Sequence, residues 1–375
     1  MQPNSDVIIL GLGAMGSAAA CHLARRGQRV LGLDRFTPPH TLGSSHGQTR
    51  IIREAYFEHP LYVPLIQRAY ELWRELDRAK GRTLFRQTGG LLLGRPDSEI
   101  VTGALRSARQ HRLKHEVLSR FRIVSRYPGF RPDGDMVAVW EPRAGFLFPE
   151  ACIETHLELA RQHGAELRFD EPALRWEPDG SGVRVVTDRG TYSAGQLLVT
   201  AGAWAKGLLP GLSLPLTVER QVLFWFAPVD LPALFWPDRC PIYIWEPAPG
   251  THFYGFPDAG TGVKVALHHQ GETATPDAVR REVGPEEVTK MRGLLDRYMP
   301  LANGPLRDTA VCLYTNTPDH HFLIDCHPAH PQVLIASPCS GHGFKFSSVL
   351  GEVLADLLIT GKTKFDLSLF RLRWR

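Results

Sequence analysis

Cations gather in the segment SSHGQTRIIR, where His46, Arg50 and Arg53 follow one another closely. The planar fork of an arginine side chain donates to both oxygens of a carboxylate at once. These cations could therefore face a cofactor or an anionic substrate. A solvated basic loop would have the same composition, so the segment alone leaves both interpretations open.

A lysine stands alone on one side of an expected strand. In VKVALHH, the alternation of side chains along a strand places Lys264 with Ala266 and His268, opposite the two valines. Lys264 is then the single formal charge on its side, and Tyr254 belongs to the same cluster one strand earlier. The alternative is a side of the sheet that faces solvent.

The segment VCLYTNTPDHHF carries Cys312 and Tyr314 on an expected apolar strand. A thiolate is a nucleophile, but a buried cysteine on such a strand is more often an inert thiol. Further on, SGHGFKF brings Gly341, Gly343 and Lys345 to the start of an expected helix. Small residues there let backbone amides approach a negative group, although an ordinary turn at the start of a helix would have the same sequence pattern.

The elements that must position these residues begin with VIILGLGAMGSAAACHLARRGQRVLGLD. Apolar strands at residues 7–10 and 30–33 flank a turn that contains Gly11, Gly13 and Gly16, and the second strand ends at Asp34. The glycines let backbone approach a pyrophosphate at a helix N-terminus, and the acid can accept hydrogen bonds from a ribose. The unit predicts an adenine dinucleotide site, without choosing between NAD and FAD.

The rest of the chain predicts an α/β fold with two interwoven domains. Residues 216–304 carry short aromatic and β-branched strands separated by Pro and Gly, as in an antiparallel sheet. The α/β pattern then returns, with a last helix that stops at Gly361. We expect a discontinuous Rossmann-like nucleotide-binding domain (1–85, 148–215 and 305–375) and an inserted substrate domain (86–147 and 216–304).

Composition narrows the class of protein. The 375 residues are 43% hydrophobic and carry a formal net charge of +4, which gives no case for nucleic acid or a membrane surface. No apolar run is long enough to span a membrane, and no secretory signal is recognisable. The six cysteines are scattered without a CxxC pair, which is typical of a reduced, cytoplasmic protein.

Taken together, these motifs resemble the monomeric sarcosine oxidase family of flavin amine oxidases. The resemblance covers nearly the whole chain and follows, in order, GLGAMG, GSSHGQTRIIR, FYGFP, VKVALHH, VCLYTNTPDHHF and SGHGFKFSS. Six ordered matches are far more specific than any one of them. They favour the functional interpretation of each cluster over the bland alternative.

The resemblance implies that the cofactor is FAD, attached covalently through Cys312 by a thioether to a flavin ring methyl. His46 and Arg50 match residues beside the flavin that support its attachment and electrostatics. The remaining residues that the resemblance assigns to the cofactor are Gly11, Gly13, Ala14, Met15, Gly16, Asp34, Gly341, Gly343 and Lys345.

For the substrate, the resemblance implies a carboxylate clamp made of Arg53 and Lys345. Lys264 matches the lysine where oxygen is activated, and a cation there would stabilise the charge that builds up on oxygen. Three further residues match those that line the substrate cavity: Tyr254, His268 and Tyr314. The resemblance also assigns Tyr254 and His268 to catalysis, with Lys264, His46 and Arg50.

The implied reaction is oxidation of the C–N bond of a secondary amino acid by oxygen, which yields hydrogen peroxide. With sarcosine, the member of this class we favour, the products are glycine and formaldehyde. The implied partners are a small amino acid and oxygen, and the implied state is a monomer. Three alternatives stay open: a flavin dehydrogenase with another electron acceptor, an NAD dehydrogenase, and a non-catalytic redox sensor.

The chain departs from the expected family pattern in two places. Ser45 stands where a second histidine is common, which affects the electrostatics near the flavin. Pro338 and Cys339 precede SGHGFKF where small and aromatic residues are expected, which would change one wall of the cavity. Cys339 is also a nearby rival to Cys312 for the attachment of the flavin.

Overall fold

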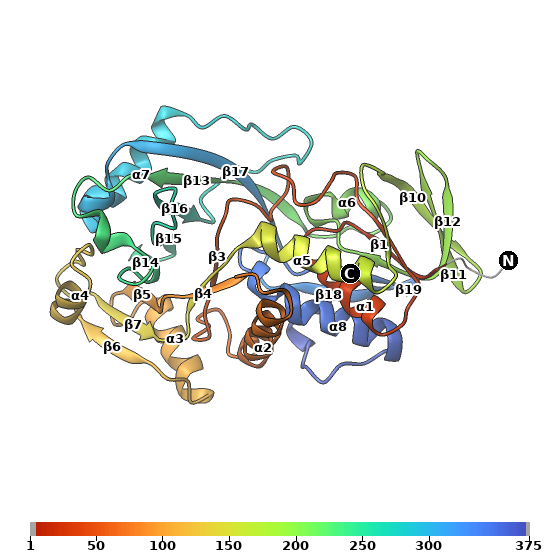
Figure 1. The fold of residues 1–375 in the computed structure, drawn as a ribbon, viewed down its shortest axis with the longest axis horizontal. Coiled ribbons are helices and arrows are strands. Elements are labelled where there is room, and N and C mark those ends of the chain that lie inside the picture. The colour runs from red at the N-terminus through yellow and green to blue at the C-terminus, as the bar shows by residue number, and fades with distance from the viewer. Residues whose placement is uncertain (1–4, 373–375) are drawn as a thin grey trace.

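The computed structural model describes residues 5–372, whose strands form two eight-stranded sheets and one three-stranded sheet. The two large sheets occupy opposite halves of the molecule (Figure 1). In the half that holds the first sheet, elements from the two ends of the chain, red and blue in the figure, lie together. The confirmed fold class is therefore mixed α/β.

The first large sheet is built around β1, which pairs in parallel with β2 on one side and β12 on the other. The residues of β1 from Val7 to Leu10 are fully buried, as expected for a central parallel strand. Its strands are β1 (Ser5–Leu10), β2 (Val30–Leu33), β9 (Glu166–Arg168), β10 (Ala173–Asp179), β11 (Gly182–Thr187), β12 (Thr191–Val199), β18 (Leu323–His327) and β19 (His330–Ser337).

Four helices pack against this sheet and share its apolar core: α1 (Ala14–Arg25), α2 (Tyr62–Lys80), α5 (Pro149–Gln162) and α8 (Ser347–Thr360). The first and last of them approach closely, because a Cβ at Gly351 of α8 would lie 2.6 Å from the backbone of Ala18 in α1. Gly361, in the left-handed conformation at φ +74°, ends α8 where the sequence predicted a stop.

The second large sheet has the order β17-β13-β16-β15-β14-β5-β7-β6. Every pair is antiparallel except β14 with β5, which is parallel, so the predicted antiparallel sheet has one exception. Its strands are β5 (Gly90–Gly94), β6 (Glu116–Ser119), β7 (Val137–Glu141), β13 (Thr217–Phe226), β14 (Ile242–Ala248), β15 (Thr251–Phe256), β16 (Val263–His268) and β17 (Leu306–Asn316).

Helix α7 (Pro285–Tyr298) covers one face of this sheet, where Met291 and Leu295 pack in the same core as Trp245 and Phe253. The small third sheet has the order β3-β8-β4. Its strands are β3 (Arg50–Ile52), β4 (Phe85–Gln87) and β8 (Gly145–Leu147), and the remaining helices are α3 (Glu99–Gln110), α4 (Arg120–Arg126) and α6 (Ala205–Leu208).

The expected domain boundary at residue 305 agrees least with the strand pairing. Strand β17 follows that boundary, yet it pairs with β13 in the second sheet rather than with a strand of the first sheet. The topology favours a boundary after β17, and the division of the chain into domains stays a proposal.

The described residues form no helix both long and apolar enough to cross a bilayer. Nor do they bring together three or more His, Cys, Asp or Glu side chains in a group that could hold a metal ion.

Candidate active site

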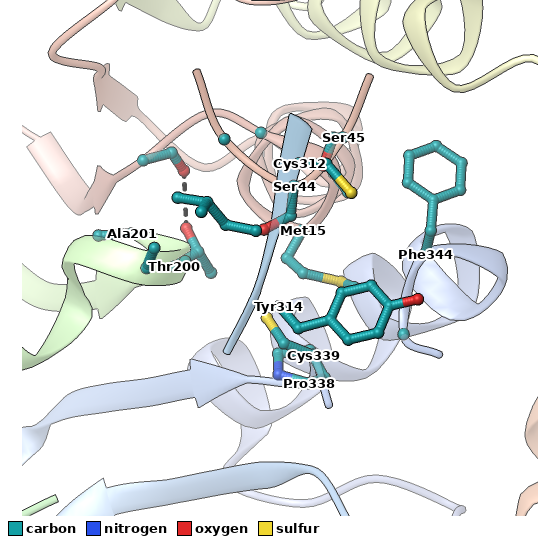
Figure 2. Close-up of a pocket in the computed structure, with 18 of the residues that line it drawn as sticks. Met15, Ser44, Ser45, Thr200, Ala201, Cys312, Tyr314, Pro338, Cys339 and Phe344 are labelled. Atoms are coloured by element: carbon teal, nitrogen blue, oxygen red, sulfur yellow. Dashed lines mark hydrogen bonds between the residues drawn. The ribbon is translucent and has the colours of Figure 1, made fainter. Parts of the chain in front are cut away.

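A cavity of about 510 Å³ is lined by the glycine turn that precedes α1 and by residues of the second sheet. In Figure 2, residues from the N-terminal turn, from β17 and from the segment after β19 converge on it. The predicted site residues that line this cavity are Gly11, Gly13, Ala14, Met15, Asp34, Arg50, Arg53, Tyr254, His268, Cys312, Tyr314, Gly341, Gly343 and Lys345. The other three, Gly16, His46 and Lys264, do not line it.

The glycines of the N-terminal turn are required by close backbone approaches. A Cβ at Gly16 would lie 1.8 Å from the carbonyl oxygen of Gly11, and Gly11 itself has φ +92°. In contrast, a Cβ at Gly13 would meet only the Ser45 hydroxyl, at 4.0 Å, and would point into the cavity space. The backbone at Gly13 is thus open to a ligand at the N-terminus of α1, which fits a pyrophosphate.

Asp34 holds this turn in place while it faces the cavity. Its carboxylate accepts the backbone N–H of Leu12 at 2.6 Å and that of Phe36 at 2.9 Å. Each oxygen keeps a further lone pair for a ribose hydroxyl. Burial raises the pKa of Asp34 to about 6, although both backbone hydrogen bonds oppose the shift.

Cys312 is buried on β17 among Leu223, Trp225, Ala266 and Tyr314. Burial raises the pKa of its thiol, and the charges of nearby cations, Arg50 first, act in the opposite direction. Cys339 lines the same cavity (Figure 2). Burial raises the pKa of that thiol to about 11, and the opposing influence there is the Ser337 side chain rather than a cation.

Lys264 lies behind the wall of the cavity and is 2% exposed, so the alternative of a solvated strand face is wrong. Its ammonium donates to the carbonyl oxygen of Gly47 at 2.6 Å, and to the carbonyl and hydroxyl oxygens of Thr49 at 2.8 and 3.1 Å. Burial lowers the pKa of Lys264 well below its usual value, and the charge of Arg50 adds to this effect.

His46 lies in the loop before β3, and Arg50 is the first residue of that strand. Arg50 donates to the carbonyl oxygens of Thr49 at 2.8 Å and Ser44 at 2.7 Å, which leaves part of its guanidinium facing the cavity. His46 is buried, and burial together with the charge of Arg50 lowers its pKa to about 3. A neutral imidazole therefore stands beside the cation.

Arg53 and Lys345 both line the cavity. Arg53 is 2% exposed and Lys345 is 5% exposed. The ammonium of Lys345 donates to the carbonyl oxygen of His342 at 2.7 Å and to the Tyr56 hydroxyl at 3.4 Å. Burial, followed by the charge of Arg53, lowers the pKa of Lys345 to about 7. Two buried basic side chains therefore line the same cavity.

Glu58 is the site residue that the sequence analysis missed. Both of its carboxylate oxygens accept from the same guanidinium nitrogen of Arg53, at 2.6 and 2.7 Å, and Glu58 lines the cavity. Burial opposes ionisation, yet the charges of Arg53, His342 and Lys345 hold the pKa of Glu58 below its usual value. The carboxylate thus occupies one terminal nitrogen of the Arg53 guanidinium, which is then not free for a bound anion.

The remaining wall is built from aromatic side chains. His268 Nδ1 lies 3.2 Å from the Tyr314 hydroxyl, and Tyr254 lies in the adjacent strand β15. Burial lowers the pKa of His268 well below its usual value, so its imidazole is neutral. Gly341, at φ +75°, packs against Tyr314 so tightly that a Cβ there would lie 2.6 Å from the ring.

Known proteins resemble this chain in sequence and in fold over nearly their whole length. The family model described as FAD dependent oxidoreductase matches residues 6–357. Monomeric sarcosine oxidase from Streptomyces avermitilis is 50% identical over 99% of this chain and 97% of its own. N-methyl-L-tryptophan oxidase from Salmonella arizonae is 38% identical over 98% of both chains. NikD, an unusual amino acid oxidase essential for nikkomycin biosynthesis, has a solved structure that matches with a TM-score of 0.84 at 26% identity, covering 98% of this chain and 97% of that one.

The chain therefore belongs to the FAD-dependent oxidoreductases and, within them, to the monomeric sarcosine oxidase family of amine oxidases. The open backbone at Gly13 and the Asp34 carboxylate fit the FAD that this family requires. The alternatives of an NAD dehydrogenase and a non-catalytic redox sensor are thereby set aside.

The ion pair between Glu58 and Arg53 leads to a prediction. Glu58→Gln should strengthen the binding of propionate, a minimal carboxylate, by about tenfold, because one charge-assisted hydrogen bond worth roughly 1.5 kcal/mol no longer competes. The dissociation constant can be measured by isothermal titration calorimetry. Glu71→Gln, at an exposed ion pair on α2, is the matched control and should change nothing. Unchanged or weaker binding in Glu58→Gln would contradict the prediction.

Proposed function

We propose that the protein oxidises the C–N bond of a secondary amino acid, with sarcosine as the favoured substrate and oxygen as the electron acceptor. The products are hydrogen peroxide and, from sarcosine, glycine and formaldehyde. The observation that carries this proposal is the pair of buried cations, Arg53 and Lys345, in the same cavity as the open backbone of Gly13. Relatives named for sarcosine and N-methyltryptophan support the class of substrate.

The residues proposed to hold FAD surround the cavity. Gly11, Gly13 and Asp34 would bind its pyrophosphate and ribose, and Cys312 would carry the covalent bond to the ring. When bound, FAD accepts the electrons of the C–N bond and passes them to oxygen. Cys312 is preferred over Cys339 because Arg50 and Lys264 favour its thiolate, whereas no cation opposes the high pKa of Cys339.

The two cations would orient the substrate. Arg53 keeps its guanidinium Nε without a hydrogen-bond partner among the described residues and could donate it to a substrate carboxylate, and Lys345 adds a point charge; together they would restrict how the amine lies in the cavity. Their charge also disfavours the protonated form of the substrate amine, and only the neutral amine can give up electrons. Neutral His268 and Tyr314 add no opposing charge at the wall.

Lys264 is proposed to assist the reaction with oxygen. Its ammonium is held on three acceptor oxygens of Gly47 and Thr49 rather than free in the cavity. In its protonated form, which burial disfavours and these three acceptors favour, the side chain is fixed before electrons arrive and would stabilise negative charge without reorganisation. The other proposals, a monomer in the cytoplasm, follow from the resemblance and the scattered cysteines.

The role of Lys264 can be tested by measuring how fast oxygen reoxidises the reduced flavin. Lys264→Met should lower the rate of flavin reoxidation by oxygen by about 10²-fold or more, while reduction of the flavin by sarcosine under anaerobic conditions changes little. Stopped-flow absorbance separates the two half-reactions. Reoxidation at the wild-type rate would contradict the role of Lys264, and fast turnover of the wild-type protein only with a quinone would favour the dehydrogenase alternative.

Covalent attachment through Cys312 has a direct assay. Acid precipitation of the purified protein should leave a yellow pellet, and Cys312→Ser should release all flavin to the supernatant. Cys339→Ser, a matched thiol in the same cavity, should keep the colour. A colourless wild-type pellet would contradict the covalent bond, and loss of colour in Cys339→Ser alone would move the attachment to that residue.

Lys345 predicts a pH dependence. Below about pH 7 its ammonium is charged and attracts a carboxylate, whereas above this pH it loses its proton and its attraction. The dissociation constant of propionate should therefore rise between pH 6 and pH 9, by up to about tenfold per pH unit, since each unit of pKa corresponds to 1.36 kcal/mol. Lys345→Met should bind weakly and independently of pH over this range. A wild-type constant that is flat over the same range would contradict the prediction.

A further inference from the structure

The turn at residues 53–58 carries both Arg53 and Glu58, and it is held from several sides. It follows β3 directly and contains no helix or strand of its own. Ser107 of α3 donates its hydroxyl to the carbonyl oxygen of Tyr56. At Gly103, one turn earlier on α3, a Cβ would lie 2.4 Å from the carbonyl oxygen of Phe57, so the helix touches the turn.

The strongest anchor comes from Glu141, the last residue of β7. One oxygen of its carboxylate accepts the backbone N–H of Glu54 at 2.8 Å, and the other accepts that of Ala55 at 2.6 Å. The carbonyl oxygen of Ala55 in turn accepts from the Arg53 guanidinium at 3.1 Å. A continuous series of hydrogen bonds therefore joins Glu141 to the cation that faces the cavity.

Burying the carboxylate of Glu141 costs more free energy than a purely structural role would require. It is 3% exposed, and no lysine or arginine among residues 5–372 forms an ion pair with it. Burial raises its pKa to about 7, against the two backbone hydrogen bonds. A buried carboxylate without a cationic partner is costly, and here its compensation consists of two charge-assisted bonds to adjacent amides of the turn.

We propose that Glu141 is a positioning residue of the carboxylate site. By accepting the N–H groups of Glu54 and Ala55, it fixes the backbone of the turn in the position from which Arg53 binds the substrate. This inference rests on the proposed function, since it assumes that Arg53 binds the substrate carboxylate. Glu141 itself touches neither the cavity nor a reacting atom. Its effect therefore passes through the backbone of the turn.

Glu141→Gln tests the proposal, because the amide keeps the shape but turns one acceptor oxygen into a donor aimed at a backbone N–H. We expect the KM for sarcosine and the dissociation constant of propionate to rise about tenfold or more, since small misplacement of a binding group is costly. kcat should change by less than about threefold. Hydrogen exchange at the amides of Glu54 and Ala55, followed by mass spectrometry, should accelerate.

The matched control is Asp77→Asn on α2. Asp77 also accepts a backbone N–H, that of Leu84 at 2.6 Å, but it does not line the cavity. The variant Asp77→Asn should lower the midpoint of thermal unfolding without changing the KM for sarcosine. If Glu141→Gln fails to fold, Glu141→Asp, which keeps the charge but shortens the reach, should give the same separation of KM from kcat.

Two outcomes would overturn the proposal, and only the second would also overturn the proposed function. Wild-type values of KM and of the propionate constant in Glu141→Gln would overturn the role of Glu141 and leave the proposed function standing. If the wild-type protein neither binds propionate nor oxidises sarcosine, the turn has no carboxylate to position, and both proposals fail together.

Discussion

Burial of positive charge is the constraint on which the candidate site depends. Arg53 and Lys345 are almost completely removed from water where they line the cavity, and Glu58 is the carboxylate that pairs with Arg53. Buried cations cost free energy unless anions and hydrogen bonds compensate them. Glu58 compensates one of them, and the second shows the deficit as a pKa lowered to about 7. A substrate carboxylate would supply the missing negative charge.

The fold brings the parts of this site together from distant segments. The nucleotide-binding turn comes from the N-terminus and Lys345 precedes the last helix, while β17 carries Cys312 into the space between the two large sheets. The same strand pairs with β13 of the second sheet, while its Cys312 lines the cavity together with the glycine turn from the first half.

Local patterns predicted much of this arrangement. The glycine turn, the apolar strands of the first sheet and the helix that ends at Gly361 are short-range features, and alternation alone placed Lys264 away from its valine neighbours. The contacts that decide charge and position were beyond sequence reasoning. Glu58 pairs with Arg53 through an irregular turn that has no period, and Glu141 reaches that turn from a strand far along the chain.

The central claim is that the two buried cations select substrates by their carboxylate. Steady-state oxidation of sarcosine should be compared with that of N-methylethylamine, which has a methyl group in place of the carboxylate. The account predicts that kcat/KM falls by about 10²- to 10⁴-fold, the loss of two hydrogen bonds to charged groups worth roughly 1.5–3 kcal/mol each. Similar values of kcat/KM for the two amines would contradict the account.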